Sequence, residues 1–407
     1  MGSRPLPSRH WPGAAWFLNS ASCRGRPPAE RSYPGGVDLV AVLRAAAARA
    51  GLAAVGFTSA APFPETLRDM GQRVAGGLHG RMRFGYADPA RATNPRASFP
   101  WAESLVVAAA GYLPAAGSPG PASPGTGKVA RFATGDHYRP LRAALGALAA
   151  VLESAGHRAA LLCDDARLVD RAAAVRAGIG WWGKSTMVLA PGQGPWLLLG
   201  SVATDAVLRP DVPMARGCGT CTACLPACPT GALVAPGVLD ARRCLAHLMQ
   251  APGAIPREWR RAMGDRLYGC DACLEACPPG GRALRAAGGR GEGRVALIEM
   301  LRMSDTDLLR RFAHFYLPGR QPRYLRRNGL VALGNAGGEG AIEAAAAFLV
   351  SPDPLLRAHA AWALGRLGGS EAQVALRAAA RGEADPAVRR EIEAALADEA
   401  PGRGSVP

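Results

Sequence analysis

Eight cysteines lie between Cys218 and Cys277, and their spacing constrains this chain more than any other feature. The 407 residues contain ten cysteines in all. The first four follow the pattern C-x2-C-x2-C-x3-C and precede Pro229; Cys244 then stands alone, and C-x2-C-x3-C follows, ending before Pro278. The first pattern is the spacing with which bacterial ferredoxins hold [4Fe–4S] clusters. Thiolates are soft ligands that suit iron, so the sequence predicts two [4Fe–4S] clusters.

The spacing also predicts which cysteines share a cluster. In two-cluster ferredoxins the fourth cysteine of one motif binds the cluster of the other motif. The second motif is one cysteine short, and Cys244 is the nearest cysteine that can complete it. The predicted ligands are Cys218, Cys221, Cys224 and Cys277 for the first cluster, and Cys228, Cys244, Cys270 and Cys273 for the second.

Two other interpretations compete with this one. Paired structural zinc sites also use four cysteines each, but they have no use for a proline after the last cysteine of both motifs. A disulfide framework belongs to small secreted domains, and no secretory segment is present. The remaining two cysteines are interpreted as a thiol in a disordered segment, Cys23, and a core residue at a strand end, Cys163.

Charge and composition bound the class of protein. The formal net charge of +16 favours a nucleic-acid partner, because cations that neutralise phosphates release counterions. Lys128 and Lys184 are the only lysines among 48 basic residues, so a coding bias toward arginine on an ordinary solvated surface is the competing explanation. No apolar run is long enough to span a membrane, and the clusters favour the reducing cytoplasm. Residues 1–36 are expected to be a disordered extension.

The segment 37–210 alternates helical and strand patterns and predicts an α/β layered domain. Helices are expected at 37–49, 138–155 and 169–176. Residues 53–58 are a short apolar stretch, and strands are expected at 105–112, 159–162, 186–190 and 196–204. The cysteine stretch then forms a ferredoxin-like domain over 211–290.

The C-terminal part, 291–400, is expected to be helical. The sequence Ala-Leu-Gly-Asn at 332–335 returns as Ala-Leu-Gly-Arg at 363–366, and Asp353-Pro354 returns as Asp385-Pro386. A repeated helix pair must stack on its neighbour to bury its apolar face, so 320–397 is predicted to form HEAT-like repeats. Such arrays bind large partners; a purely structural cap on the cluster domain is the alternative.

Several segments together resemble the epoxyqueuosine reductases, which are cobalamin- and iron–sulfur-dependent enzymes of tRNA modification. They are CGTCTACLPACPTGAL with VLDARRC (218–244), MGDRLYGCDACLEACP (263–278), DRAAAVRAGIGWWGKS (170–185) and AAWALGRLG (360–368). The resemblance runs from about residue 37 to 397. It implies reduction of the epoxide of epoxyqueuosine at the tRNA wobble position to queuosine, with base-off cobalamin reduced by the clusters.

The resemblance also implies roles for individual residues. Asp164 matches the acid that protonates the oxygen released from the epoxide, with Asp165 a rival because this chain reads Cys-Asp-Asp-Ala-Arg there. The alternative is that either aspartate merely ends a strand. Arg91 matches a cobalamin contact; in an arginine-rich chain an ordinary surface residue is the alternative.

Further positions follow from the same resemblance. Val188 and Leu199 match strand positions that contact the corrin, and otherwise they are core residues. Cys270 and Asp271 match the place where the second cluster meets the cobalamin, which makes that cluster the proximal one. Arg171 and Lys184 match positions near the tRNA substrate.

The chain departs from the family pattern at 135–138, where Gly-Asp-His-Tyr stands in place of Gly-x-Asp-Tyr-His. His137 is therefore not assigned a catalytic role. No Asp-x-His-x-x-Gly segment is present to supply a histidine to cobalt, and no glycine-rich nucleotide fingerprint is present either. Electrons are then expected from a separate flavodoxin or ferredoxin, and the protein is expected to be a monomer. The alternatives are a corrinoid reductive dehalogenase and a non-enzymatic electron carrier or tRNA-binding adaptor.

Overall fold

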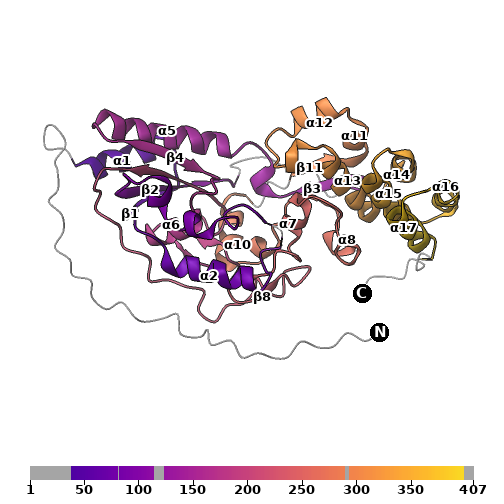
Figure 1. The fold of residues 1–407 in the computed structure, drawn as a ribbon, viewed down its shortest axis with the longest axis horizontal. Helices are drawn as coiled ribbons and strands as arrows, with labels where there is room; N and C mark the ends of the chain where they lie inside the picture. The colour runs from indigo at the N-terminus through magenta and orange to yellow at the C-terminus, as the bar shows by residue number, and fades with distance from the viewer. Residues whose placement is uncertain (1–37, 81, 114–122, 289–292, 398–407) are drawn as a thin grey trace.

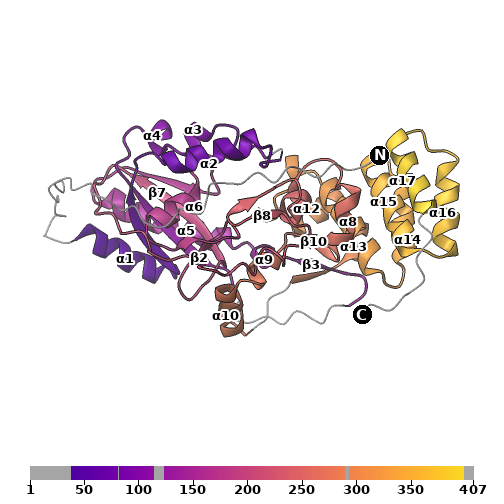
Figure 2. The same cartoon turned by 90° about the horizontal axis from the view of Figure 1, so that it is seen from below.

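The protein is elongated, with a sheet domain at one end and a helical array at the other (Figures 1 and 2). The computed structural model describes residues 38–80, 82–113, 123–288 and 293–397. The expected disordered extension, 1–36 with Cys23, lies outside the described residues. No helix within these ranges combines the length and the apolar character needed to cross a bilayer.

A four-stranded sheet forms the core of the first domain. Its order is β1 (Ala54–Ser59), β2 (Ser104–Gly111), β7 (Leu197–Thr204) and β4 (Ala159–Cys163). Every neighbouring pair is antiparallel. Strand β2 reads SLVVAAAG and is buried along nearly its whole length, because helices cover both faces of the sheet.

The two faces of the sheet carry different helices. Helices α1 (Leu39–Arg49) and α5 (Tyr138–Ser154) pack on one face through a core that includes Leu43, Leu145 and Trp196. Helix α6 (Asp170–Arg176) packs on the other face. Three further helices follow β1 in the chain: α2 (Pro64–Ala75), α3 (Pro89–Ala92) and α4 (Pro95–Ser98). The predicted α/β layering is therefore confirmed.

One predicted strand is much shorter than expected. The sequence predicts a strand over 186–190, but only β6 (Val188–Leu189) forms, paired with β5 (Trp181–Trp182) in a hairpin outside the main sheet. Thr186 has φ +67°, in the left-handed region, which an extended strand cannot include. The turn closes where the Gly183 N–H donates to the Met187 carbonyl.

A second, three-stranded sheet joins segments that are distant in the chain. Strand β3 (Thr126–Val129) lies between β10 (Arg266–Tyr268) and β11 (Gly293–Ala296). Each strand comes from a different predicted domain, and the boundaries 37–210, 211–290 and 291–400 stay predictions. Around the cysteines lie short elements: β8 (Leu233–Ala235), β9 (Val238–Leu239), α7 (Leu245–Gln250), α8 (Arg257–Met263), α9 (Ala272–Glu275) and α10 (Pro278–Ala286).

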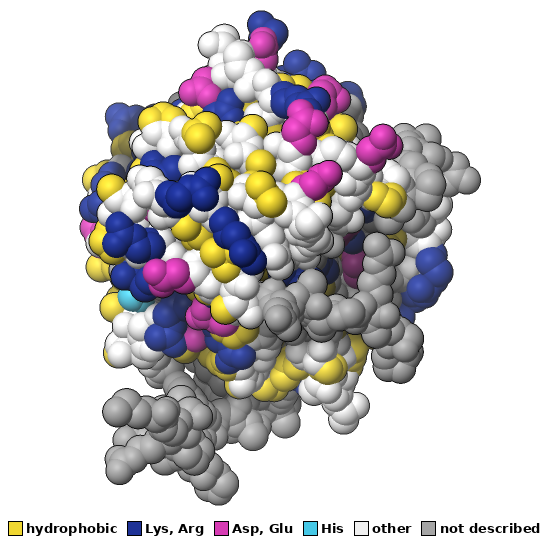
Figure 3. All heavy atoms as spheres, turned by 90° about the vertical axis from the view of Figure 1, so that its right-hand side faces the viewer, with side chains coloured by type: hydrophobic (Ala, Val, Ile, Leu, Met, Phe, Trp, Pro, Cys, Tyr) yellow, Lys and Arg dark blue, Asp and Glu magenta, His cyan; other side chains and the backbone are white. Residues whose placement is uncertain are grey.

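The rest of the chain is helical. Its helices are α11 (Leu297–Arg302), α12 (Asp305–Arg311), α13 (Arg323–Ala336), α14 (Ala341–Ala346), α15 (Pro354–Leu367), α16 (Ser370–Ala380) and α17 (Pro386–Ala397). The repeated glycine lies where helices touch: a Cβ on Gly334 would lie 2.8 Å from the Ala363 Cα, and one on Gly365 would lie 2.9 Å from the Ala395 Cα. The repeat in the sequence thus marks close helix contacts, and the predicted stacking is confirmed. At this end of the molecule, basic side chains are interspersed with acidic and apolar ones (Figure 3).

Candidate functional site

The cysteines of the double motif form two groups of four. Cys224 and Cys277 are buried and Cys221 is exposed, while the other five are half-buried. Burial raises the pKa of Cys224, and repulsion from Cys218, Cys277 and Cys221 adds to that effect. Burial likewise raises the pKa of Cys277, again with repulsion from Cys218 and Cys221. These four thiols therefore lie close to one another.

The other four thiols form the second group. Burial raises the pKa of Cys273, and the largest repulsions on it come from Cys270, Cys244 and Cys228. Burial also raises the pKa of Cys244, where Cys270 and Cys228 act in the same direction. These repulsions agree with the ligand sets predicted from spacing, and one of them, from Cys224 on Cys273, acts between the two sets. The individual ligand assignments stay a prediction.

The surroundings of Cys228 favour its thiolate. Burial alone would raise the pKa of Cys228, but hydrogen bonds, with backbone N–H donors at Thr230, Leu233 and Ala232, outweigh it and lower the pKa. The Ala232 N–H lies 3.2 Å from the sulfur. Thiolate is the form that binds metal, so this loop favours the form of Cys228 that can act as a metal ligand. In the described parts of the chain, no three His, Cys, Asp or Glu side chains have the geometry of a single-ion site.

Asp164 lies directly after β4 and is held in an unusual backbone conformation. Its φ is +54°, a left-handed geometry that aspartate tolerates better than most residues. The residue is exposed, yet the partial burial of its carboxyl group raises the pKa of Asp164. Nearby Arg142 opposes this rise and Asp165 reinforces it.

Asp165 has the opposite character. Its carboxylate forms a two-pronged ion pair with Arg167, with a closest distance of 2.6 Å. The hydrogen bond from Arg167 lowers the pKa of Asp165, and the charge of Arg91 contributes in the same direction. Two adjacent carboxyl groups therefore have pKa values shifted in opposite directions, the pattern that separates a proton donor from a fixed anion.

Two residues beside Asp164 were not predicted from the sequence, Asp170 and Tyr138. The Oδ1 of Asp170 is buried without a hydrogen-bond partner among the described residues. Burial raises the pKa of Asp170 well above its usual range, with repulsion from Asp164 adding to it. Burial also raises the pKa of Tyr138, and Asp164 is the largest charge acting on it. The segment DRAAAVR at 170–176 carried a signal for Asp170; Tyr138 was visible only as the start of a helix.

Asp271 joins the second cysteine motif to the sheet domain. It is 3% exposed and accepts hydrogen bonds from the backbone N–H of Arg131 at 2.8 Å and from its Nη1 at 3.3 Å. The same guanidinium lies 2.5 Å from Glu275 and 5.2 Å from the centre of the Trp196 ring. Burial raises the pKa of Asp271, against the lowering effect of Arg131.

The predicted substrate residues lie on the hairpin side of the site. The Nη1 of Arg171, at the start of α6, donates to the Thr186 carbonyl at 3.4 Å. The Nζ of Lys184 donates to the Gly219 carbonyl at 2.6 Å, and its backbone N–H lies 3.5 Å from the Cys218 sulfur. Lys184 therefore contacts the loop of the first cysteine group.

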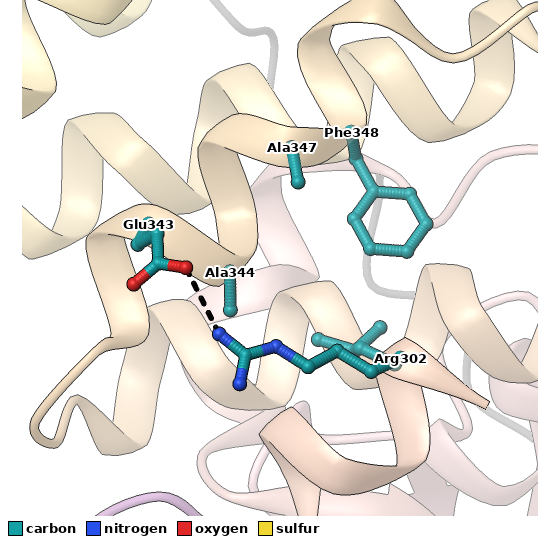
Figure 4. Close-up of a pocket in the computed structure, with 6 residues that line it drawn as sticks. Arg302, Glu343, Ala344, Ala347 and Phe348 are labelled. Carbon is teal, nitrogen blue, oxygen red and sulfur yellow. Dashed lines mark hydrogen bonds and ion pairs between the residues drawn. The ribbon is translucent and has the colours of Figure 1, made fainter.

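The remaining predicted residues lie in α3 and in the sheet domain. Arg91 is exposed in α3, where its Nε donates to Ser98 at 2.9 Å. Val188 is 3% exposed and half-buried Leu199 packs against the same core. A separate groove of about 480 Å³ lies between α11 and α14, where Arg302 pairs with Glu343 at 3.0 Å beside Phe348 (Figure 4). None of the predicted site residues lines that groove.

Comparisons with known proteins place this architecture. A family model described as a 4Fe-4S double cluster binding domain matches residues 217–280, which contain all eight cysteines, and one described as HEAT repeats matches 316–397. The epoxyqueuosine reductase of Bacillus subtilis (strain 168) is 34% identical over 357 residues, covering 84% of this chain and 91% of the relative. That of Staphylococcus aureus is 33% identical over 338 residues, covering 79% and 87%. The chain belongs to the epoxyqueuosine reductase family.

Solved structures of epoxyqueuosine reductases share the fold. A selenomethionine-labelled one has a TM-score of 0.81 at 31% identity, covering 89% of this chain and 100% of that one. Another, crystallised with a tRNA-Tyr epoxyqueuosine-modified stem loop, has a TM-score of 0.80 at 31% identity, covering 88% and 98%. The family resemblance predicted from the motifs is confirmed, as are the double-cluster domain, the HEAT repeats and the oxidoreductase class.

Proposed function

We propose that this protein reduces the epoxide of epoxyqueuosine at the wobble position of a tRNA anticodon, giving queuosine. One observation carries the proposal beyond family membership. Asp164 combines a raised pKa, a left-handed backbone and no ion pair among the described residues, in a chain that also carries a double-cluster domain. The release of an epoxide oxygen requires a proton donor, and a raised pKa favours the protonated, donating form of a carboxyl group.

The reaction is a two-electron reduction. Two electrons and two protons convert the epoxide to an alkene, and the oxygen leaves as water. When bound, the two clusters and a base-off cobalamin would supply the electrons and the carbon–oxygen chemistry. The residues of the chain then have to bind and orient these groups, exclude water and deliver protons.

The carboxyl of Asp164 is the proposed proton donor. A carboxylate that is ionised at neutral pH cannot donate, so the raised pKa of Asp164 favours it over Asp165, whose pKa is lowered by Arg167. Burial raises the pKa of Asp170, and the charge of Asp164 raises it further. Asp170 is therefore a second carboxyl at this strand end whose protonated form is favoured.

Two acceptors in the sheet domain suit a ligand rich in amides. The Oδ1 atoms of Asn94, which follows α3, and of Asp170, beside Asp164, have no partner among the described residues, so they are candidates to accept from the peripheral amide groups of a corrin. Arg91 lies near enough to Asp165 to lower its pKa, and its guanidinium suits the phosphate of the cobalamin tail. Val188 and Leu199 would contact the corrin from the sheet, and Cys270 and Asp271 from the side of the second cluster. The absence of an Asp-x-His-x-x-Gly segment fits a cobalt without a histidine from that motif.

The tRNA is proposed to approach on the side of Arg171 and Lys184. Arg171 is exposed beside Asp170, where its charge lowers the pKa of that acid. Lys184 also contacts Gly219, so it connects the substrate side to the first cluster loop. A separate flavodoxin or ferredoxin is proposed to supply electrons to the clusters.

The test is turnover of an anticodon stem-loop that carries epoxyqueuosine, with purified protein under anaerobic conditions and a chemical reductant. The expected product is lighter by one oxygen atom, as measured by mass spectrometry. Asp164→Asn should reduce the rate by about 10²–10⁴-fold while iron and cobalt content stay unchanged. Asp165→Asn is the matched control and should retain most of the activity. An active Asp164→Asn enzyme would remove this residue from the mechanism, and wild-type protein that leaves the stem-loop unchanged would refute the proposed function.

A further inference from the structure

The segment between two proposed ligands of the second cluster, Cys244 and Cys270, lies against the HEAT helices. It contains α7, which begins directly after Cys244, and α8, and it ends at β10 just before Cys270. Helices α7 and α8 have six and seven residues. Helices this short are unstable alone and depend on tertiary contacts. Figure 2 shows α8 and β10 beside α13.

Arg327 of α13 makes the densest of these contacts. It is 0% exposed, and its guanidinium donates to the carbonyls of Ala251 at 2.8 Å, Met249 at 3.0 Å and Leu248 at 3.2 Å, and to that of Gly253. These carbonyls lie at and just beyond the C-terminal end of α7, where a helix leaves acceptors without partners. Asn328 adds a donor to the Met249 carbonyl at 2.9 Å.

Burying the charge of Arg327 costs free energy unless these carbonyls stay in hydrogen-bonding position. Burial lowers the pKa of Arg327 to about 9, and its guanidinium pairs with no carboxylate among the described residues. A buried cation is tolerated only where hydrogen bonds replace its water. The carbonyl cage and Arg327 therefore fix each other, and α7 is fixed with them.

Two more HEAT side chains hold the rest of the segment. The Nδ2 of Asn335 donates to the carbonyls of Arg260 at 2.8 Å and Gly264 at 3.0 Å. His359 of α15 lies with its Nε2 3.3 Å from the Ile255 backbone nitrogen. Apolar residues of the segment and of the repeats also share one core.

The first cluster group is held from the opposite side. Lys184 of the sheet domain contacts Gly219 and Cys218. The Trp196 Nε1 donates to the Gly280 carbonyl at 2.9 Å, just beyond Cys277. The first group is therefore held by the sheet domain, whereas the second is held by the HEAT helices and, through Asp271, by Arg131.

We propose that the HEAT array holds the second cluster in place and that Arg327 is the main positioning residue in these contacts. The inference rests on the proposed division of the eight cysteines between two clusters. It gives the repeats a role in holding cofactor, separate from any contact with tRNA. It also predicts a selective effect, because loss of these HEAT contacts should affect the second cluster and spare the first.

The experiment compares Arg327→Met with wild type in anaerobically purified full-length protein. Iron per chain should fall from about eight to about four, and the electron paramagnetic resonance signal of the second reduced cluster should disappear while that of the first remains. Arg327→Lys should restore part of the second signal, since an ammonium can donate to some of the carbonyls. The matched control is Arg323→Met on the same helix, whose guanidinium is 42% exposed and pairs with Asp353 inside the array; both signals should persist.

The outcomes separate the possibilities. The inference is overturned if Arg327→Met keeps both clusters at wild-type levels and potentials, or loses both equally. If that variant does not fold, Asn335→Ala decides. It should lower the occupancy or shift the potential of the second cluster only, and no change in either would overturn the inference. Wild-type protein without two four-iron clusters would instead refute the ligand assignment itself.

Discussion

Asp271→Asn tests whether the sheet domain and the second cysteine motif are held together by a buried ion pair. The carboxylate of Asp271 and the guanidinium of Arg131 are each 3% exposed. Asparagine keeps the size of the side chain and an oxygen for the Arg131 backbone N–H. It removes the negative charge that compensates a buried cation.

The expected loss follows from burial and from the remaining partner. Breaking a buried pair by removing one charge costs about 3–5 kcal/mol. Here Glu275 still lies 2.5 Å from the same guanidinium. Burial also offsets part of the attraction, since it raises the pKa of Asp271 against the effect of Arg131, so a loss near the lower limit, about 3 kcal/mol, is expected. At about 2–4 °C per kcal/mol for a domain of this size, the melting temperature should fall by about 6–12 °C.

The assay is thermal unfolding followed by circular dichroism, with all proteins purified anaerobically. Glu275→Gln is the matched control, because Glu275 pairs with the same arginine but its side chain is 32% exposed. A partly exposed pair contributes about 1 kcal/mol or less, so this variant should melt within about 4 °C of wild type. Equal losses in the two variants, or no loss in Asp271→Asn, would show that burial of the pair does not determine its contribution.

Two further predictions concern single positions. Gly280→Ala should destabilise the protein by about 1–3 kcal/mol and lower first-cluster occupancy, because a Cβ there would lie 2.2 Å from the Leu274 carbonyl oxygen. Gly281→Ala is the control, since a Cβ there meets no atom closer than 3.4 Å. Equal iron loss in both variants would contradict the packing argument. His359 is fully buried, and burial lowers its pKa well below 6.5. Below about pH 6.5 the unfolded chain therefore binds a proton at this residue that the folded chain does not. Folding stability is lost as the pH falls. Melting temperatures at pH 7.5 and 5.5 should therefore differ more for wild type than for His359→Gln, and parallel slopes would contradict this origin.

The sequence predicted best what is local. Two-residue spacers bring neighbouring cysteines of one motif together whatever the surrounding fold. The exchange of Cys228 and Cys277 between the groups was predicted from the ferredoxin rule, and Cys244 from its position in the sequence. The repeats could be read because Gly334 and Gly365 recur at equivalent helix contacts. The short hairpin strand within 186–190 could not be predicted correctly. The left-handed backbone at Thr186 depends on a hairpin turn that the apolar pattern does not indicate.

At the candidate site the sequence could not predict the surroundings of each carboxyl group. Asp164 and Asp165 are adjacent and chemically identical in the sequence. Arg167 satisfies one of them and leaves the other without an ion pair among the described residues. Asp170 became relevant only when its Oδ1 proved buried without a partner. Composition and spacing do not contain that information.

The division of the chain into successive domains hides how the cluster region is supported. Strand β3 leaves the sheet domain to pair with β10 and β11, and Arg327 reaches back from the repeats to the end of α7. Because both supports join residues far apart in sequence, each is lost if either partner is cut away. The cysteines between them therefore require the flanking domains to hold their geometry, and the cluster region is unlike a small ferredoxin, which forms its sites within one short chain.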